Sequence, residues 1–199
     1  MLKKKNNKSE LKNLIVQNRR KEKEKKEKVN IGWVSKITII AFLISFSLSF
    51  VAQAALPNIS LFFGILLTLL FIFIGILFDI VGVSVTSADE KVFHSMNARQ
   101  VKGAKVAVKF KKNADKVASF CNDVIGDICG IVSGAAATTI AVSISNSLNW
   151  NLLWMNLVVA AIVASLTIGG KAIGKSFAIN KSDIILYEFS KIVSIFYKG

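Results

Sequence analysis

Histidine, cysteine and proline are scarce in this chain of 199 residues, which holds one, two and one of them respectively. Zinc-type sites need clustered Cys and His side chains, but His94 stands alone and no Cys/His spacing of that kind occurs. Cys121 and Cys129 share one apolar segment, where a helix would hold their sulfurs roughly 12 Å apart, beyond disulfide reach. We therefore expect no soft-metal site and interpret both cysteines as small buried residues.

The groups that catalysis usually requires are also missing. Apart from its one histidine, the chain offers no nucleophile motif and no clustered acid–base pair beyond a few aspartates in apolar segments. We therefore expect that the protein is not an enzyme.

Apolar residues, in contrast, are abundant and form long blocks. They make up 53% of the chain, and the mean hydropathy of +0.53 is too high for an ordinary soluble domain. Each block is near the roughly 20 residues that span hydrocarbon. The four blocks cover residues 33–53, 61–82, 119–145 and 150–169. The sequence therefore predicts an all-α integral membrane bundle with four transmembrane helices.

Two short connections join these blocks in pairs. Residues 54–60 contain Pro57, the one proline of the chain, which breaks a helix and predicts a tight hairpin. Residues 146–151 are polar and uncharged, and Trp154 follows at a position typical of the membrane interface.

Basic residues are distributed unevenly and predict the orientation. Of 26 Lys and Arg residues, 13 lie at or before Lys36, eight lie within 84–118, five lie from Lys171 onward, and neither short connection holds any. The positive-inside rule then places both termini and the 84–118 loop in the cytoplasm, as in a multi-pass protein of the cell membrane.

The basic tail at residues 1–32 has two interpretations. Its low-complexity Lys/Glu run cannot bury a core. The favoured interpretation is that the tail sets the orientation of the protein in the membrane and is attracted to anionic lipid headgroups. Nucleic-acid binding is the weaker alternative, because no aromatic residues interleave with the charges. A further alternative is a signal peptide cleaved after Ala52-Gln53-Ala54, although the segment before it is unusually long.

Ionisable residues in apolar segments are costly, so each is a candidate for function. Asp79, Asp123, Asp127 and Lys171 all fall toward the predicted cytoplasmic side. Carboxylates with amide and hydroxyl oxygens suit a hard cation such as Mg²⁺. The alternative is an internal ion pair between an aspartate and Lys171 that holds the bundle together.

A row of small residues follows in the third block. Asn122, Gly126, Gly130 and Gly134 are spaced by four, which places them on one face of a helix. Such a face permits close helix packing and can also expose carbonyl oxygens near a binding site.

Residues 181–197 have the pattern of an amphipathic helix. One face would carry five apolar side chains, which are Ile185, Phe189, Ile192, Val193 and Phe196. At this length, and with Glu188 and Lys191 interrupting it, we expect the helix to lie at the inner membrane interface or to pack as a belt.

Three stretches resemble the transmembrane domain of the cyclin M and CorC-type magnesium transporters. Residues 87–97 (Ser-Ala-Asp-Glu-Lys-Val-Phe-His-Ser-Met-Asn) resemble the family's Ser-x-Ser-Glu-Thr-Ala stretch and its following Ser-Leu-Asn. Residues 103–105 and 113–122 resemble the juxtamembrane helices that lead into a Gly-Asn motif, here Cys121-Asn122. Residues 169–175 (Gly-Gly-Lys-Ala-Ile-Gly-Lys) resemble the family's Gly-Glu-x-x-Pro-Lys.

The resemblance covers about residues 61–197 and implies a homodimer that holds Mg²⁺ between its spans through serine, asparagine and backbone oxygens. By motif position, the metal-binding candidates are Ser84, Ser87, Asn122 and the backbone of Gly169 and Gly170. Asp127 is added to these candidates because it is a charged residue in an apolar segment. Glu90 matches a glutamate with a structural or gating role in the family. The resemblance further implies a domain at 57–199, preceded by an additional span at 33–56 and the tail at 1–32.

The sequence also departs from the family pattern. Lys171 replaces the acidic residue of the last motif, Gly174 replaces its proline, and the paired nucleotide-binding regulatory modules usual in the family are not expected in this chain. Two hypotheses therefore remain open. The first is a divergent transporter of Mg²⁺ or another divalent cation, and the second is a membrane scaffold or accessory subunit that has lost the ion site.

Overall fold

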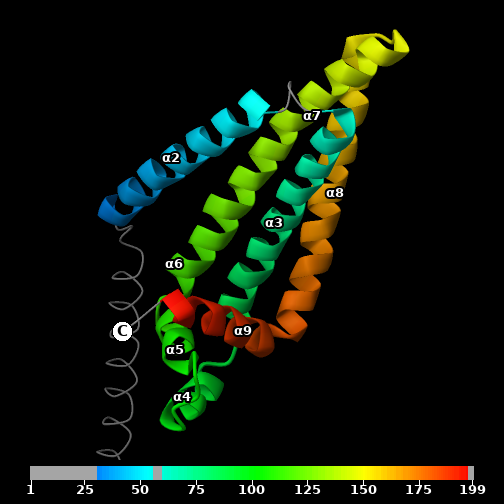
Figure 1. The fold of residues 1–199 in the computed structure, drawn as a ribbon. Helices are drawn as coiled ribbons and strands as arrows, with labels where there is room; N and C mark the ends of the chain where they lie inside the picture. Colours follow the sequence, from blue (N-terminus) through cyan, green and yellow to red (C-terminus); the bar gives the residue numbers. More distant parts are fainter. Residues whose placement is uncertain (1–30, 56–59, 197–199) are drawn as a thin grey trace, which may run out of the picture. The chain divides into compact units, whose positions relative to one another are not determined.

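The computed structural model describes residues 31–55 and 60–196 of the protein (Figure 1). The basic tail before residue 31 and the tip of the first predicted hairpin lie outside the described residues. Within the described ranges every regular element is helical. The prediction of an all-α helical bundle is therefore confirmed.

Among the described residues, four helices or helix runs are long and apolar enough to cross a membrane, as the sequence predicted. They are Ile31–Ala54, Leu61–Ser87, Ala114–Leu148 and Leu152–Asn180. The corresponding elements are α2 (Ile31–Ala55), α3 (Leu61–Ser87), α6 (Ala114–Ser119) with the π-helix η2 (Phe120–Gly126) and α7 (Asp127–Leu148), and α8 (Leu152–Asn180).

The fourth of these helices is longer than its apolar block predicted. The block was expected to end at residue 169, but α8 continues to Asn180. The hydropathy falls at Lys171, yet nothing there interrupts the helical hydrogen bonds, because Gly169 and Gly170 are tolerated within a helix. Exposed apolar side chains also continue along this extension, at Ile173, Phe177 and Ile179.

Two polar side chains of helix α2 find hydrogen-bond partners within the helix itself. Thr38 donates a hydrogen bond to the carbonyl of Val34, and Ser47 donates one to the carbonyl of Leu43. A helix in hydrocarbon requires such internal partners, because lipid offers none.

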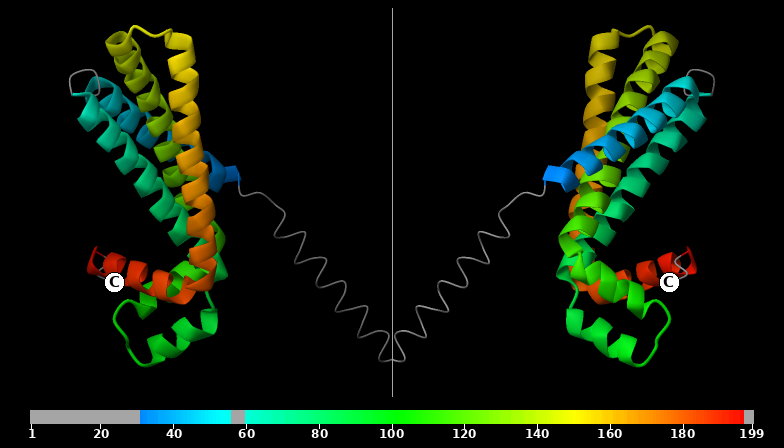
Figure 2. Two further views of the ribbon diagram at one scale, coloured as in Figure 1. Left: turned by 90° about the vertical axis from the view of Figure 1, so that its right-hand side faces the viewer. Right: turned by 90° about the vertical axis from the view of Figure 1, so that its left-hand side faces the viewer.

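Helices α3, α7 and α8 pack against one another in pairs and form the bundle (Figure 2). The face of α3 that meets the other two is built from small and polar residues: Gly64, Thr68, Gly75, Asp79 and Gly82 are all buried. Its outward side carries large exposed side chains such as Phe62, Leu70 and Phe73. This distribution is typical of membrane helices, which pack through small residues and present apolar ones to lipid.

The end of the bundle near Ser87 is covered by three shorter helices, α4 (Glu90–Ala98), α5 (Ala104–Lys112) and α9 (Ser182–Phe196) (Figure 1). One buried apolar cluster joins them to α3 and comprises Val85, Ala88, Phe93, Ala107, Val108 and Leu186. Gly103 begins α5 with a φ of 88°, and a side chain there would meet the backbone of Lys191 in α9.

Helix α9 forms nearly where the sequence predicted it, but a different face is buried. Leu186 and Ser190 are fully buried, whereas Ile185, Phe189 and Val193 of the predicted face are partly exposed and Ile192 is exposed. The buried face is therefore displaced by about one position from the most apolar face, which leaves apolar side chains facing outward.

Candidate functional site

The π-helix η2 lies inside the third candidate span and carries Asn122. π-helical turns are uncommon and occur frequently at functional sites, because they widen the helix and re-aim side chains. Here the widened turn brings Asn122 onto α3. A Cβ atom added at Gly82 would collide with the side-chain amide of Asn122, so Gly82 provides the space that the amide fills.

The amide oxygen of Asn122 is buried and has no hydrogen-bond partner. One carboxylate oxygen of Asp79, three residues before Gly82 on the same helix, is also buried without a hydrogen-bond donor. Buried polar atoms are almost always hydrogen-bonded, so each exception calls for an explanation such as a water or an ion. Both atoms are acceptors, and both therefore suit a cation.

A second close approach between α3 and the third span lies one to two turns away, at Gly75 and Gly126. A Cβ atom built on Gly75 would lie 3.3 Å from the carbonyl oxygen of Gly126. One built on Gly126 would lie 3.3 Å from the carbonyl oxygen of Cys121 and 3.6 Å from that of Gly75. The crossing thus brings backbone oxygens of α3 and of the third span close together, and Cβ of Cys129 lies 3.1 Å from the Cβ position of Gly75.

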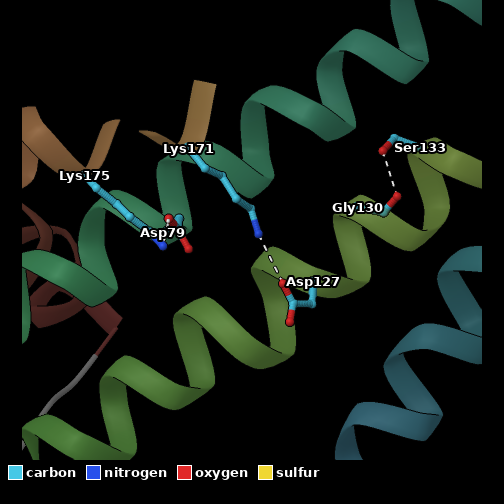
Figure 3. Close-up of polar contacts among 6 residues, drawn as sticks. All are labelled: Asp79, Asp127, Gly130, Ser133, Lys171 and Lys175. Atoms are coloured by element: carbon cyan, nitrogen blue, oxygen red, sulfur yellow. Dashed lines mark hydrogen bonds and ion pairs between the residues drawn. The ribbon is translucent and has the colours of Figure 1, made fainter. Parts of the chain in front are cut away.

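The ammonium group of Lys171 reaches this crossing from α8 (Figure 3). Its Nζ atom lies 3.6 Å from the Cβ position of Gly126 and 3.1 Å from Oδ1 of Asp127, to which it donates a hydrogen bond. The Lys171 side chain is 19% exposed and that of Asp127 is 64% exposed. Of the two alternatives that the sequence left open for Lys171, the structure shows an ion pair with an aspartate.

A second pair, one turn further along α8, joins that helix to α3. Nζ of Lys175 lies 3.6 Å from Oδ2 of Asp79, whose side chain is only 5% exposed (Figure 3). This separation is too long for a hydrogen bond. The charge of the Asp79 carboxylate is therefore neutralised, but Oδ2 still lacks a hydrogen-bond donor. Lys175 was not among the residues that the sequence singled out as charged partners. Its position four residues after Lys171, on the same helix face, is a signal that could have identified it.

A third ammonium group caps the end of α3. Nζ of Lys111 donates hydrogen bonds of 2.9 Å to the carbonyl of Val85 and 2.8 Å to that of Thr86. A cation is favourable at a helix C-terminus, where carbonyl groups lack partners. Sequence reasoning did not identify this contact either, because α5 and α3 are brought together only by packing.

The remaining predicted residues are placed less favourably for an ion. Ser84 is fully buried, and its hydroxyl group donates to the carbonyl of Ile80, whereas Ser87 is exposed at the last position of α3. Asp123 is exposed. Glu90 forms a 3.1 Å contact with His94 on the exposed surface of α4.

Gly169 and Gly170 lie within continuous α-helix, so their carbonyl groups belong to its hydrogen-bond ladder. A side chain at Gly169 would meet open space, and one at Gly170 would meet only the tip of Ile76. The structure therefore places Asn122 at the contact of η2 with α3 and pairs Lys171 of α8 with Asp127 of α7, but nothing lies within 4 Å of a side chain added at Gly169.

The row of glycines is only partly used for packing. Gly126 meets α3, but side chains added at Gly130 or Gly134 would meet nothing within 4 Å. The reason is geometric: four residues of an α-helix turn through about 400°, so an exact four-residue repeat drifts about 40° per step around the helix. Gly134 has therefore rotated away from the interface and is exposed.

No protein-family model matches this chain, and no curated protein matches it. Within residues 31–55 and 60–196, no group of three or more His, Cys, Asp or Glu side chains is placed to hold a metal ion. Any cation held here would consequently depend on amide and backbone oxygens together with single carboxylates.

Proposed function

We propose that the protein is a multi-span membrane domain that binds and transports a divalent cation, with Mg²⁺ as the leading candidate, at the contact of α3 with η2. The observation that carries the proposal is the buried amide oxygen of Asn122, which faces the backbone of Gly82 and has no donor. Mg²⁺ prefers oxygen ligands and retains several waters, so one amide oxygen and one carboxylate are sufficient protein ligands. The resemblance to magnesium transporters at Cys121-Asn122 supports the same residue.

The lysines fit this proposal as resident counter-charges. Asp79 and Asp127 each face an ammonium group, which neutralises them where water is scarce. An entering Mg²⁺ would compete with these ammonium groups for the carboxylates. The transport step is then an exchange of partners, with Lys171 and Lys175 released as the divalent cation arrives.

The Lys171–Asp127 pair also favours a second candidate, a membrane scaffold or accessory subunit without an ion site. An ammonium group at the glycine crossing already occupies the space among the oxygens. In that case the pair is permanent and holds α7 against α8, and the fold serves to bind another membrane subunit.

For either function we propose the same arrangement in the cell membrane. Both termini and helices α4, α5 and α9 face the cytoplasm, because the basic residues gather on that side. The tail contacts anionic headgroups, and two copies form a homodimer. Nucleic acid is not proposed as a partner, and no catalytic activity is proposed.

Isothermal titration of the metal-stripped protein in detergent with Mg²⁺ separates the two candidates. Transport predicts saturable binding that Asn122→Ala weakens by about tenfold or more, the range seen when a partner of a bound metal is lost. Asn156→Ala, on α8 within a candidate span, is the matched control and should leave binding unchanged. Lys171→Glu should strengthen binding, because it replaces the competing cation with a carboxylate.

Two outcomes would contradict the transport proposal. One is an absence of binding at millimolar Mg²⁺ in a folded sample, which would favour the scaffold. The other is binding that Asn122→Ala and Asn156→Ala affect equally. If binding follows the expected pattern, Mg²⁺ flux into liposomes containing the protein is the next measurement.

A further inference from the structure

An apolar groove lies between the end of α3 and helix α9, on the outside of the bundle. Its walls include Leu77 and Val81 of α3, Phe177 of α8, and Ile184, Ile185 and Phe189 of α9. Its volume is about 460 Å³, within the roughly 300–1,000 Å³ that is typical of ligand sites. It shares no residue with the contact of α3 and η2 described above.

The surroundings of the groove are apolar at the depth where the spans end. Phe177 of α8 and Ile184 of α9, which both line the groove, are 50% and 61% exposed. A continuous apolar surface of this kind is unfavourable in water and is normally covered by a partner or by lipid. Leu77 belongs to the candidate span α3, so the groove opens at membrane depth.

One basic residue lies beside the wall of the groove. Nζ of Lys181 is 5.8 Å from the ring centroid of Phe177, which forms part of that wall. The one acidic residue in the lining, Glu188, is 3.6 Å from Nζ of Lys191 and is therefore compensated. An apolar slot with an ammonium group beside its wall matches a molecule with an acyl chain and an anionic head.

We infer that an anionic phospholipid binds in this groove, with one acyl chain along Leu77 and Ile185 and its phosphate at Lys181. A lipid fits better than a second copy of the chain, because an anionic headgroup would pair with Lys181, whereas the same face of a second copy would bring another Lys181. The lipid would come from the leaflet on the side of α9, which is the cytoplasmic leaflet in the proposed orientation. It would fix the position of α9 against α3.

Native mass spectrometry of the full chain tests this inference, with phosphatidylglycerol and phosphatidylcholine of identical acyl chains as probes. We expect the wild-type protein to retain phosphatidylglycerol preferentially. Lys181→Gln should lower that preference by about fivefold, the effect of one basic residue near an anionic surface. Lys102→Gln, in the connection between α4 and α5, is the control for a general loss of charge.

A second pair of variants tests the groove itself. Leu77→Trp would fill the slot and should reduce retention of both lipids. Leu70→Trp lies seven residues earlier on the outward side of α3 and should have no effect. Equal retention of the two lipids by the wild-type protein would overturn the inference, as would identical behaviour of Leu77→Trp and Leu70→Trp. A dimer that forms only when the lipid is removed would instead assign the groove to a second copy.

Discussion

At the scale of single residues, the contact of Asn122 with Gly82 depends on the absence of a side chain. Gly82 lies in the middle of a helix, where glycine is less favourable than alanine by roughly 1 kcal/mol. That cost is offset by the room it gives the Asn122 amide, which no larger residue would provide. Glycine at position 82 therefore lowers the stability of α3 locally but allows the Asn122 amide to pack against it.

We predict that Gly82→Ala displaces the Asn122 amide and lowers the free energy of unfolding by about 1–3 kcal/mol, the usual cost of overpacking. The matched control is Gly134→Ala, because a side chain there meets nothing within 4 Å. The control should leave stability unchanged or raise it by up to about 1 kcal/mol through helix propensity. Thermal unfolding in detergent measures both. Equal midpoints for the two variants would refute the proposed contact.

The charged residues show how far residue-level reasoning reaches. The sequence identified Asp79, Asp127 and Lys171 as costly charges that needed partners or a ligand, because that follows from their chemistry alone. It did not identify Lys175 as the partner of Asp79 or Lys111 as the cap of α3. The spacing of Lys175 four residues after Lys171 marks it as a candidate, but which aspartate it meets depends on which helices lie side by side.

At the scale of elements, α9 shows that hydropathy does not identify the most deeply buried face. The sequence placed Ile185 and Phe189 on the apolar face of the helix, and both are partly exposed, whereas Leu186 and Ser190 are fully buried. An amphipathic helix at a membrane has two apolar surroundings, protein and lipid, and hydropathy does not distinguish them. The most apolar face therefore lines the groove, while a less apolar one packs into the cluster around Phe93.

We predict that Leu186→Ala destabilises the protein by about 2–5 kcal/mol, because it opens a cavity in that cluster. Ile184→Ala, two positions earlier on the same helix and 61% exposed, should cost far less. The test is the midpoint of thermal unfolding of each variant in the same detergent. Comparable losses for the two substitutions would mean that α9 is not packed as described.

At the scale of the whole molecule, orientation in the membrane rests on the distribution of Lys and Arg. The proposed orientation places the basic segments on the cytoplasmic side, because Lys and Arg are costly to move across hydrocarbon, and the polar, uncharged connection at 146–151 on the other side. This property belongs to the chain as a whole and does not depend on any single contact.

We predict that the cysteine introduced by Ser147→Cys reacts with a membrane-impermeant maleimide on intact cells. The cysteine introduced by Lys102→Cys should react only after the cells are permeabilised. Ser147 and Lys102 are both exposed, so the membrane alone should decide access. The wild-type protein provides the background, because Cys121 and Cys129 are buried. The reverse pattern of labelling would invert the proposed orientation.

The sequence by itself determined the all-α class, the four apolar helices and the set of charges that would need partners. These follow from the length and composition of continuous segments, and a bilayer leaves a helix few alternatives. Only the tertiary structure decided that a π-helical turn seats Asn122 on Gly82, that Lys171 meets Asp127, and that α9 buries Leu186 and Ser190 most deeply. Each of these depends on residues distant in the chain meeting at one place, where small differences in rotation decide which side chains touch.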